Sequence, residues 1–380
     1  MKSYTFAMPA TVHAGPGAVS MLPELIKDLG AKSPIIFTDR ILYEAGVAIR
    51  VEAAVAGAKV YKEIEPDPSS EQILKALDVL KESDADIVIA VGGGSVIDVA
   101  KMSSILMENK KDLAEYADNW DLLDKQGLPL ITIPTTVGSG SEMTRGAVFV
   151  DTKSHAKKVI VSNFLAARAC ILDPELLNTL PASVAAATGA DALTQAIEGV
   201  VSLNSTAFTD ALHLNAIRLI RDALKPAVQD RSNVEAMGNM QEAAAMVGAA
   251  MAYSGVGAVH AIANTLGGHF HIPHGVACAI MLLPVLEYNA HAAAHRYRLV
   301  AEALNLDTSS RTDDEVAESV IKHVRQLMND IGFNRRLSEF GINEKDVSWL
   351  AVESHGHSDM VSNPRKPTVE EVEQLIREAL

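Results

Sequence analysis

The chain is poor in the residues that mark several classes of protein. Its 380 residues include only two cysteines, Cys170 and Cys278. Two cysteines provide neither a disulfide framework nor the paired spacing of a zinc finger, so a reducing cytoplasm is the expected compartment. Acidic residues outnumber basic ones, giving a formal net charge of −15 without a basic run. We therefore expect no binding to nucleic acid or to an anionic membrane surface.

Long apolar segments are missing as well. The N-terminal sequence MKSYTFAMPATVHAG has neither an uninterrupted apolar stretch nor a cleavage site, so no signal peptide is expected. The longest clean apolar run, residues 243–252, is shorter than the about 20 residues that span a membrane. We expect core helices here, in a chain long enough for two domains or one large α/β unit.

Permanent charge is absent from residues 243–286, yet this segment contains four histidines: His260, His269, His271 and His274. A segment without Asp, Glu, Lys or Arg is expected to be mostly buried. A buried imidazole needs a hydrogen-bond partner or a metal ion. The cluster therefore predicts a metal or acid–base centre in the C-terminal half.

The first 160 residues alternate between strand and helix signals. Apolar runs of strand length stand at residues 34–38, 87–91 and 128–133. Between the first two runs, Ile73, Leu77 and Leu80 recur at helical spacing, and Ser69 with Gln72 predicts a capping box at the start of that helix. Unbroken apolar strands that alternate with helices are typical of an open, doubly wound, Rossmann-like parallel sheet.

Strand signals fade after about residue 180, and helix-forming residues dominate the rest of the chain. Thr312 with Glu315, and Thr368 with Glu371, predict capping boxes of two later helices. Pro181 precedes another helical segment. We therefore predict an N-terminal α/β domain over residues 1–181 and an all-helical domain over residues 182–380.

A glycine-rich turn, GGGSVIDVAK, directly follows the strand at residues 87–91. Three glycines let the backbone approach a ligand closely, and the N-terminus of the following helix favours phosphate. The segment matches neither a nucleoside-triphosphatase loop nor GxGxxG. A simple tight turn remains the alternative, but the position after a buried strand favours a phosphate site.

Two further polar features follow predicted strands. The segment PTTVGSGSE, residues 134–142, brings short hydroxylated side chains to the end of the third strand, where open α/β sheets bind ligands. Asp39 ends the first strand and is placed to accept hydrogen bonds from a ribose, which favours NAD over NADP. The alternatives are a loop that caps its own backbone and a solvated turn aspartate.

A metal site is predicted from residues in the second half. Asp191 and Gln195 are four residues apart and share one face of a helix. Together with His260 and His274, the Asp191 carboxylate provides the minimum ligand set for a divalent transition metal. Taken alone, Asp191 would be better explained as a charge near a helix start, and each histidine as a hydrogen-bonded core imidazole, but the set together favours a metal.

Taken together, the motifs resemble the iron-containing (group III) alcohol dehydrogenase family. The segments that carry the resemblance are GGGSVIDVAK, PTTVGSGSE, ATGADALTQAIEG and HAIANTLGGHFHIPHGVA, and it extends from the region of Tyr4–His13 to Asn363-Pro364-Arg365. It implies a nucleotide-binding α/β domain followed by a helical domain, the architecture also found in dehydroquinate synthase, with the active site in the cleft between them.

The resemblance also implies roles for individual residues. The implied NAD-binding residues are Asp39, Asp67, Gly93, Gly94, Ser95, Asp98, Thr135, Thr136, Ser139 and Lys157. Asp191, Gln195, His260 and His274 occupy the four metal-ligand positions. The expected cofactors are NAD and a divalent metal, iron(II) first and zinc as the alternative.

Three positions depart from the family pattern. Gln195 stands where a histidine ligand is usual, and an amide oxygen binds iron or zinc more weakly. Asn264 replaces a second histidine four residues after His260, so a proton-transfer role passes to Asn264, His271 or water. Asp359 stands where some members have a cysteine.

The sequence thus predicts a metal-dependent alcohol dehydrogenase or aldehyde reductase that transfers a hydride between NAD(H) and a small primary alcohol or aldehyde. A dimer or larger homo-oligomer is expected from the family resemblance. Two alternatives stay open: an NAD- and metal-binding lyase of the dehydroquinate synthase type, and a non-catalytic NAD-binding homologue.

Overall fold

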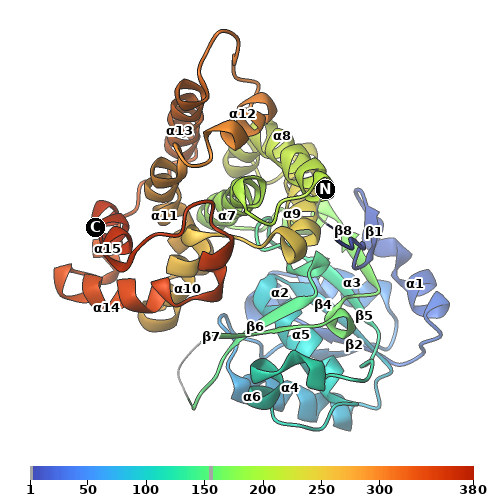
Figure 1. Cartoon of the computed structure of the whole chain (residues 1–380). Helices are drawn as coiled ribbons and strands as arrows, with labels where there is room; N and C mark the ends of the chain where they lie inside the picture. Colours follow the sequence, from blue (N-terminus) through green and yellow to red (C-terminus); the bar gives the residue numbers. More distant parts are fainter. Residues whose placement is uncertain (1–2, 154–156) are drawn as a thin grey trace. The chain divides into compact units, whose positions relative to one another are not determined.

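The computed structural model describes residues 3–153 and 157–380 (Figure 1). The chain divides into two compact units, Met1–Leu180 and Pro181–Leu380. The nucleotide-binding and metal-binding functions assigned to the predicted domains, residues 1–181 and 182–380, remain predictions.

The first unit is built on a parallel sheet of six strands in the order β1-β8-β5-β4-β2-β3. Its strands are β1 (Thr11–Ala14), β2 (Pro34–Phe37), β3 (Lys59–Tyr61), β4 (Ile87–Gly92), β5 (Leu130–Pro134) and β8 (Ala169–Leu172). A separate antiparallel hairpin pairs β6 (Gly146–Val150) with β7 (Lys157–Val161). The helices of this unit are α1 (Leu22–Asp28), α2 (Arg40–Glu44), α3 (Val47–Ala54), α4 (Ser70–Glu82), α5 (Gly94–Leu106) and α6 (Leu113–Asp118).

Helices cover both faces of this sheet, as the apolar strands predict. Successive side chains of a strand point to opposite faces. Val88 and Ala90 of β4 therefore join a core with α4 and α5, whereas Ile87, Ile89 and Val91 join a second core with α1 and α3. The predicted doubly wound α/β fold is confirmed.

The predicted helix starts are largely observed. Thr312 with Glu315 and Thr368 with Glu371 form complete capping boxes. Ser69 caps α4 by accepting a hydrogen bond from the Gln72 backbone N–H. The prediction of a complete capping box is wrong, because the second hydrogen bond of the box, to the Gln72 side chain, is missing. The Gln72 side-chain oxygen is buried without a hydrogen-bond partner among the described residues.

The second unit, all of whose residues are described, consists of helices and irregular segments, which confirms the helical prediction (Figure 1). Its α-helices are α7 (Ala182–Val201), α8 (Ala207–Gln229), α9 (Val234–Ser254), α10 (Ala258–Phe270), α11 (His274–Asn289), α12 (Ala294–Ala303), α13 (Asp313–Asp330), α14 (Glu344–His355) and α15 (Val369–Ala379). The segment from Ala185 to Val201 of α7 is almost entirely buried, including the polar residues Asp191, Gln195 and Glu198. Charged and amide groups therefore lie within an apolar helix core.

Within the described residues, no single helix is long and apolar enough to cross a membrane. The pair α9 and α10 passes that test only when joined, and the two helices are bent by 102° relative to each other.

A buried lysine ties the hairpin of the first unit to α5. The Lys101 ammonium donates hydrogen bonds to the carbonyl oxygens of Ser141, Thr144 and Gly146, at 2.6, 3.1 and 2.8 Å. Burial lowers the pKa of Lys101 to about 8, although the nearby Asp98 and Glu142 carboxylates oppose this shift. The buried Lys101 ammonium thus holds the segment between β5 and β6 against α5.

Glu142, in the same buried layer, generates a testable pH dependence. Burial raises the pKa of Glu142 from 4.5 to about 7, so the folded chain retains a proton that the unfolded chain loses over this interval. The resulting stability is fully present below pH 4.5 and is lost as the pH rises through about 7. We expect Glu142→Gln to gain stability relative to the wild type over this interval, by on the order of 3 kcal/mol. Urea unfolding of both proteins at about pH 5 and about pH 8 measures this, and a pH-independent difference would contradict it.

Candidate functional site

Three adjacent parallel strands deliver most of the predicted nucleotide-binding residues to one edge of the sheet. Because β2, β4 and β5 are neighbours and parallel, their carboxyl ends lie at the same edge. Asp39 follows β2, the segment Gly93–Ser95 follows β4, and Thr135, Thr136 and Ser139 follow β5. Such an edge is where open α/β sheets bind ligands.

The loops after β4 and β5 touch each other. The Thr135 backbone N–H donates to the Gly92 carbonyl oxygen at 3.1 Å. A side chain at Gly94 would place its Cβ 3.0 Å from the Ser139 hydroxyl oxygen, and one at Gly93 would meet Thr136 at 3.1 Å. Glycine therefore allows this close approach at the N-terminus of α5, where unpaired backbone N–H groups favour an anion.

Three other predicted residues form a chain of contacts beside this turn. The Asp67 backbone N–H donates to the Ser95 hydroxyl at 3.3 Å, and Lys157 of β7 pairs with the Asp67 carboxylate at 2.7 Å. Asp67 adopts a left-handed backbone conformation with φ of 51°. The hairpin and the residues before α4 are thus joined to the start of α5.

Two predicted residues use their carboxylates within the chain. Asp39 caps α2 by accepting a hydrogen bond from the Leu42 backbone N–H at 2.8 Å, and burial raises its pKa. Asp98 accepts from the Ser141 hydroxyl at 2.6 Å and from the Val148 backbone N–H at 3.0 Å. Asp98 therefore anchors the loop after β5, whereas its implied role in the glycine-rich turn and the ribose contact of Asp39 stay predictions.

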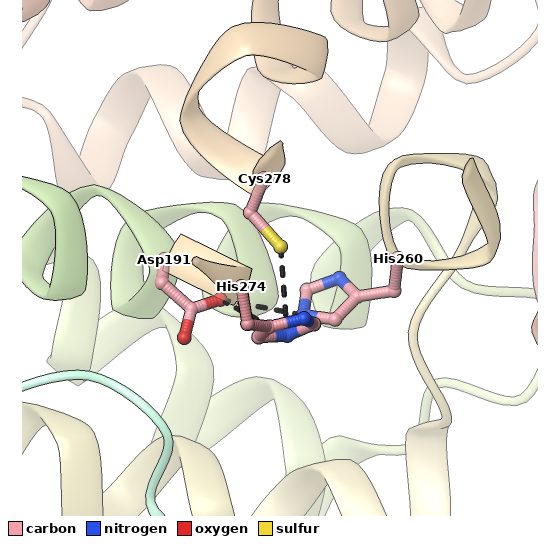
Figure 2. Close-up of side chains that lie close together, drawn as sticks. All are labelled: Asp191, His260, His274 and Cys278. Carbon is pink, nitrogen blue, oxygen red and sulfur yellow. Dashed lines mark hydrogen bonds and ion pairs between the residues drawn. The ribbon is translucent and has the colours of Figure 1, made fainter. Parts of the chain in front are cut away.

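In the second unit, four potential metal ligands converge (Figure 2). Asp191 comes from α7, His260 from the first turn of α10, and His274 and Cys278 from the first two turns of α11. Their ligating atoms all lie within 4.8 Å of one another. The structure thus brings together three of the four predicted ligands, which are far apart in the sequence, and adds a thiol.

The geometry leaves buried polar atoms without partners. His260 Nε2 and His274 Nε2 lie 3.4 and 3.9 Å from Asp191 Oδ1. In the described part of the chain, neither Asp191 Oδ1 nor His260 Nε2 makes a hydrogen bond, and the same holds for the buried Gln195 Oε1. A carboxylate oxygen and two imidazole nitrogens that lie close together are a ligand set that suits a divalent metal, so these residues fit a bound metal ion.

Electrostatics keep Asp191 available as an anionic ligand. Burial alone raises the pKa of the Asp191 carboxyl, but the adjacent His260 and His274 imidazoles and the Gln195 amide hold it below its ordinary value. The carboxylate is therefore charged before any metal arrives.

Glu198 orients His260 from the side opposite to Asp191. Its carboxylate lies 2.5 Å from His260 Nδ1 and also accepts the Val259 backbone N–H at 2.8 Å. Burial alone lowers the pKa of His260, yet Cys278, Glu198 and Asp191 together raise it. With Nδ1 hydrogen-bonded to Glu198, Nε2 is the nitrogen that faces Asp191 and would give up its proton when a metal binds, which is the usual carboxylate–histidine–metal arrangement.

A close helix contact places His274. A Cβ at Gly275 would lie 2.7 Å from the Ala187 carbonyl oxygen, so only glycine lets the N-terminus of α11 rest directly on α7. This contact brings His274 within reach of Asp191, one turn further along α7.

The two predicted catalytic residues are placed differently. The Asn264 amide, one turn after His260, donates to the Asp359 carboxylate at 3.2 Å. His271 is exposed and ends α10 in a left-handed conformation with φ of 53°. Their catalytic roles remain predictions.

Sequence reasoning did not single out Glu198 or Cys278 as site residues. The signals were present, because Glu198 lies seven residues after Asp191 and Cys278 lies four after His274, on the same helix faces.

Adding a methyl group to the glycine-rich turn tests the nucleotide site. Gly94→Ala should displace Ser139 and crowd the approach of a pyrophosphate, raising the Kd for NAD by about tenfold, equivalent to about 1.4 kcal/mol. Calorimetric NAD titration measures this, with Gly268→Ala as the control because its added Cβ meets nothing within 4 Å. Unchanged NAD affinity in Gly94→Ala would refute a phosphate role for this turn.

Removing the charge that orients His260 tests the metal site. Glu198→Gln should lower zinc affinity by about 10- to 100-fold, as loss of a ligand's hydrogen-bond partner does. Competition with a chromogenic chelator measures the affinity. Glu353→Gln is the matched control, since Glu353 accepts from the surface histidine His269 at 2.8 Å. Equal affinities in the two variants would show that Glu198 has no such role.

Comparison with known proteins is consistent with this geometry. The model of the iron-containing alcohol dehydrogenase family matches residues 9–174, and the model of the C-terminal part of that family matches residues 185–380. The NAD-dependent methanol dehydrogenase of Bacillus methanolicus is 32% identical over 379 residues, covering 99% of each protein. The 1,3-propanediol dehydrogenase of Citrobacter freundii is 34% identical over 384 residues, covering 100% of this chain and 99% of the relative.

A solved structure agrees over the full length. The alcohol dehydrogenase from Oenococcus oeni superimposes with a TM-score of 0.95 at 35% identity, covering 100% of both chains. Family models that match both units, together with full-length relatives, establish the relationship. The chain belongs to the iron-containing alcohol dehydrogenase family.

Proposed function

We propose that this chain is a metal-dependent alcohol dehydrogenase that also works in reverse as an aldehyde reductase, transferring a hydride between NAD(H) and a small primary alcohol or aldehyde. The observation that carries the proposal is that two buried atoms, Asp191 Oδ1 and His260 Nε2, lie 3.4 Å apart beside His274 and make no hydrogen bond with the described residues. Burying polar atoms without hydrogen bonds costs free energy that a bound cation would offset.

The metal would be held by Asp191, His260 and His274, with Gln195 at the remaining family position. When bound, a divalent metal supplies Lewis acidity that lowers the pKa of a substrate hydroxyl. Glu198 retains a proton at His260 Nδ1 and so keeps the opposite nitrogen available. Iron(II) is proposed as the resident metal, with zinc able to compete for the same nitrogen and oxygen ligands.

Asn264 and His271 are proposed to handle the proton. The Asn264 amide is fixed by Asp359, which leaves its carbonyl oxygen to accept a hydrogen bond from a substrate hydroxyl or a water molecule. His271 is exposed, so its imidazole can exchange a proton with solvent.

The nucleotide is proposed to bind the first unit at the carboxyl ends of β2, β4 and β5. Gly93, Gly94 and Ser95 would hold the pyrophosphate at the N-terminus of α5, while Asp39 would meet the adenosine ribose and disfavour a 2′-phosphate. Asp67, Thr135, Thr136, Ser139 and Lys157 would line the rest of the site, with Asp98 ordering the loop. The name of the Bacillus methanolicus relative supports NAD as the cofactor.

The substrate class is proposed from the relatives. Methanol and 1,3-propanediol, named in two of them, are both small primary alcohols. A cytoplasmic homodimer or larger assembly is proposed on the family resemblance, and the two unpaired buried cysteines are compatible with a reducing compartment.

Removing the metal tests the mechanism. Enzyme treated with a chelator should lose NADH formation from primary alcohols by at least about 100-fold while its Kd for NAD changes less than about threefold. Absorbance at the NADH band and calorimetric NAD titration report the two quantities separately, and re-addition of iron(II) or zinc should restore turnover. Full activity in metal-free protein would overturn the proposal.

A panel of alcohols and aldehydes then identifies the reaction. Protein loaded separately with iron(II) and with zinc should produce NADH from at least one primary alcohol and consume NADH with the matching aldehyde. A lyase that binds NAD and metal would show no net NADH change, and a non-catalytic homologue would show neither turnover nor stoichiometric metal.

A further inference from the structure

We propose, on the basis that this unit holds a catalytic metal, that the Cys278 thiolate is a metal ligand, making the centre an aspartate–histidine–histidine–cysteine site in which sulfur replaces the nitrogen missing at Gln195. Figure 2 shows the Cys278 sulfur pointing toward the imidazoles of His260 and His274 and lying across from Asp191. All four ligating atoms belong to one cluster.

Two of the separations are close to the edges of a tetrahedron around one ion. With metal–nitrogen and metal–oxygen bonds of about 2.0 Å, tetrahedral ligands lie about 3.3 Å apart, and with a metal–sulfur bond of about 2.3 Å, sulfur and nitrogen lie about 3.5 Å apart. The observed separations are 3.4 Å between His260 Nε2 and Asp191 Oδ1 and 3.6 Å between Cys278 Sγ and His274 Nε2. The separation between His274 Nε2 and Asp191 Oδ1 is longer, at 3.9 Å. A small movement of the partly exposed His274 side chain would shorten it.

The local sequence explains how sulfur reaches this position. His274 and Cys278 are the first and fifth residues of α11, so they project from the same face one turn apart. The Gly275 contact sets that helix end against α7. Cys278 is completely buried, and the neighbouring His274 is partly exposed.

The chemistry favours sulfur over the amide. A thiolate is anionic and soft, whereas an amide oxygen is neutral and hard, so sulfur is the stronger ligand for zinc, cobalt or iron(II). On metal binding, the S–H bond of Cys278 breaks, the sulfur–metal bond forms, and the proton leaves to solvent. The thiolate also tilts the preference of the site toward zinc.

Cobalt(II) is the probe that detects this bond directly. Metal-free protein titrated with cobalt(II) alone should develop a sulfur-to-cobalt charge-transfer band in the near ultraviolet that saturates at one cobalt per chain. Cys278→Ser should lose the band and bind cobalt more weakly by more than about 100-fold, exceeding the usual effect of an outer-shell partner. Cys170→Ser is the matched control, because Cys170 is also fully buried but lies in β8 of the first unit, and it should retain the band.

Gln195 provides the opposite arm of the experiment. Gln195→Ala should keep the charge-transfer band and most of the cobalt affinity if sulfur occupies the fourth position. Gln195→His combined with Cys278→Ser should recover affinity without recovering the band, because an imidazole then replaces the thiolate. Loss of the band in Gln195→Ala, or its persistence in Cys278→Ser, would overturn the assignment.

X-ray absorption of the wild-type protein loaded with zinc keeps the proposal testable if a variant fails to fold. One sulfur at about 2.3 Å from zinc is expected, and a shell of only nitrogen and oxygen would refute it. The outcomes separate this inference from the proposed function. NADH formation without a metal–sulfur bond would refute only the assignment of Cys278 as a ligand. A metal–sulfur bond without any turnover would refute the proposed dehydrogenase function and leave the metal site in place.

Discussion

The second unit depends on a buried carboxylate and a buried imidazole that face each other without a hydrogen bond between them. Asp191 and His260 lie in an almost solvent-free core of apolar helices. A buried polar atom left without a hydrogen bond costs about 1–3 kcal/mol. Glu198 pairs with only one of the two ring nitrogens of His260. The other nitrogen faces the space between Asp191 and His274, where a cation would bind. The helices of this unit therefore surround a cation site, and their apolar side chains strengthen the attraction between the cation and its ligands by excluding water.

The proposed nucleotide site of the first unit depends on a different constraint, because a dinucleotide needs a broad edge of backbone donors. Parallel strands end together, and their loops inherit the same edge. What keeps these loops close is a buried layer beneath them, in which Lys101 binds three carbonyl oxygens and Asp98 binds Ser141 and Val148. In the proposed function, each unit forms its own part of the site from contacts within that unit.

Much of this architecture was accessible from the sequence. Unbroken apolar runs predicted strands covered on both faces, and the isolated polar residues of α7 and the charge-free segment predicted the metal site. The misses have a common cause. The Gln72 side chain, the cap role of Asp39 and the convergence of Glu198 and Cys278 depend on which atoms meet after folding. Periodicity specifies the face of a helix, but it does not specify what the opposite helix presents to that face.

The contact of Gly275 with the Ala187 carbonyl has a consequence for how such a centre changes over evolutionary time. Because main chain rests on main chain there, the position of the ion is set by the scaffold and survives exchange of individual donor atoms. During evolution, a nitrogen ligand can then be replaced by a sulfur ligand, and the preferred transition metal can change with it. The metal-binding position is then retained, and only the element that binds there changes.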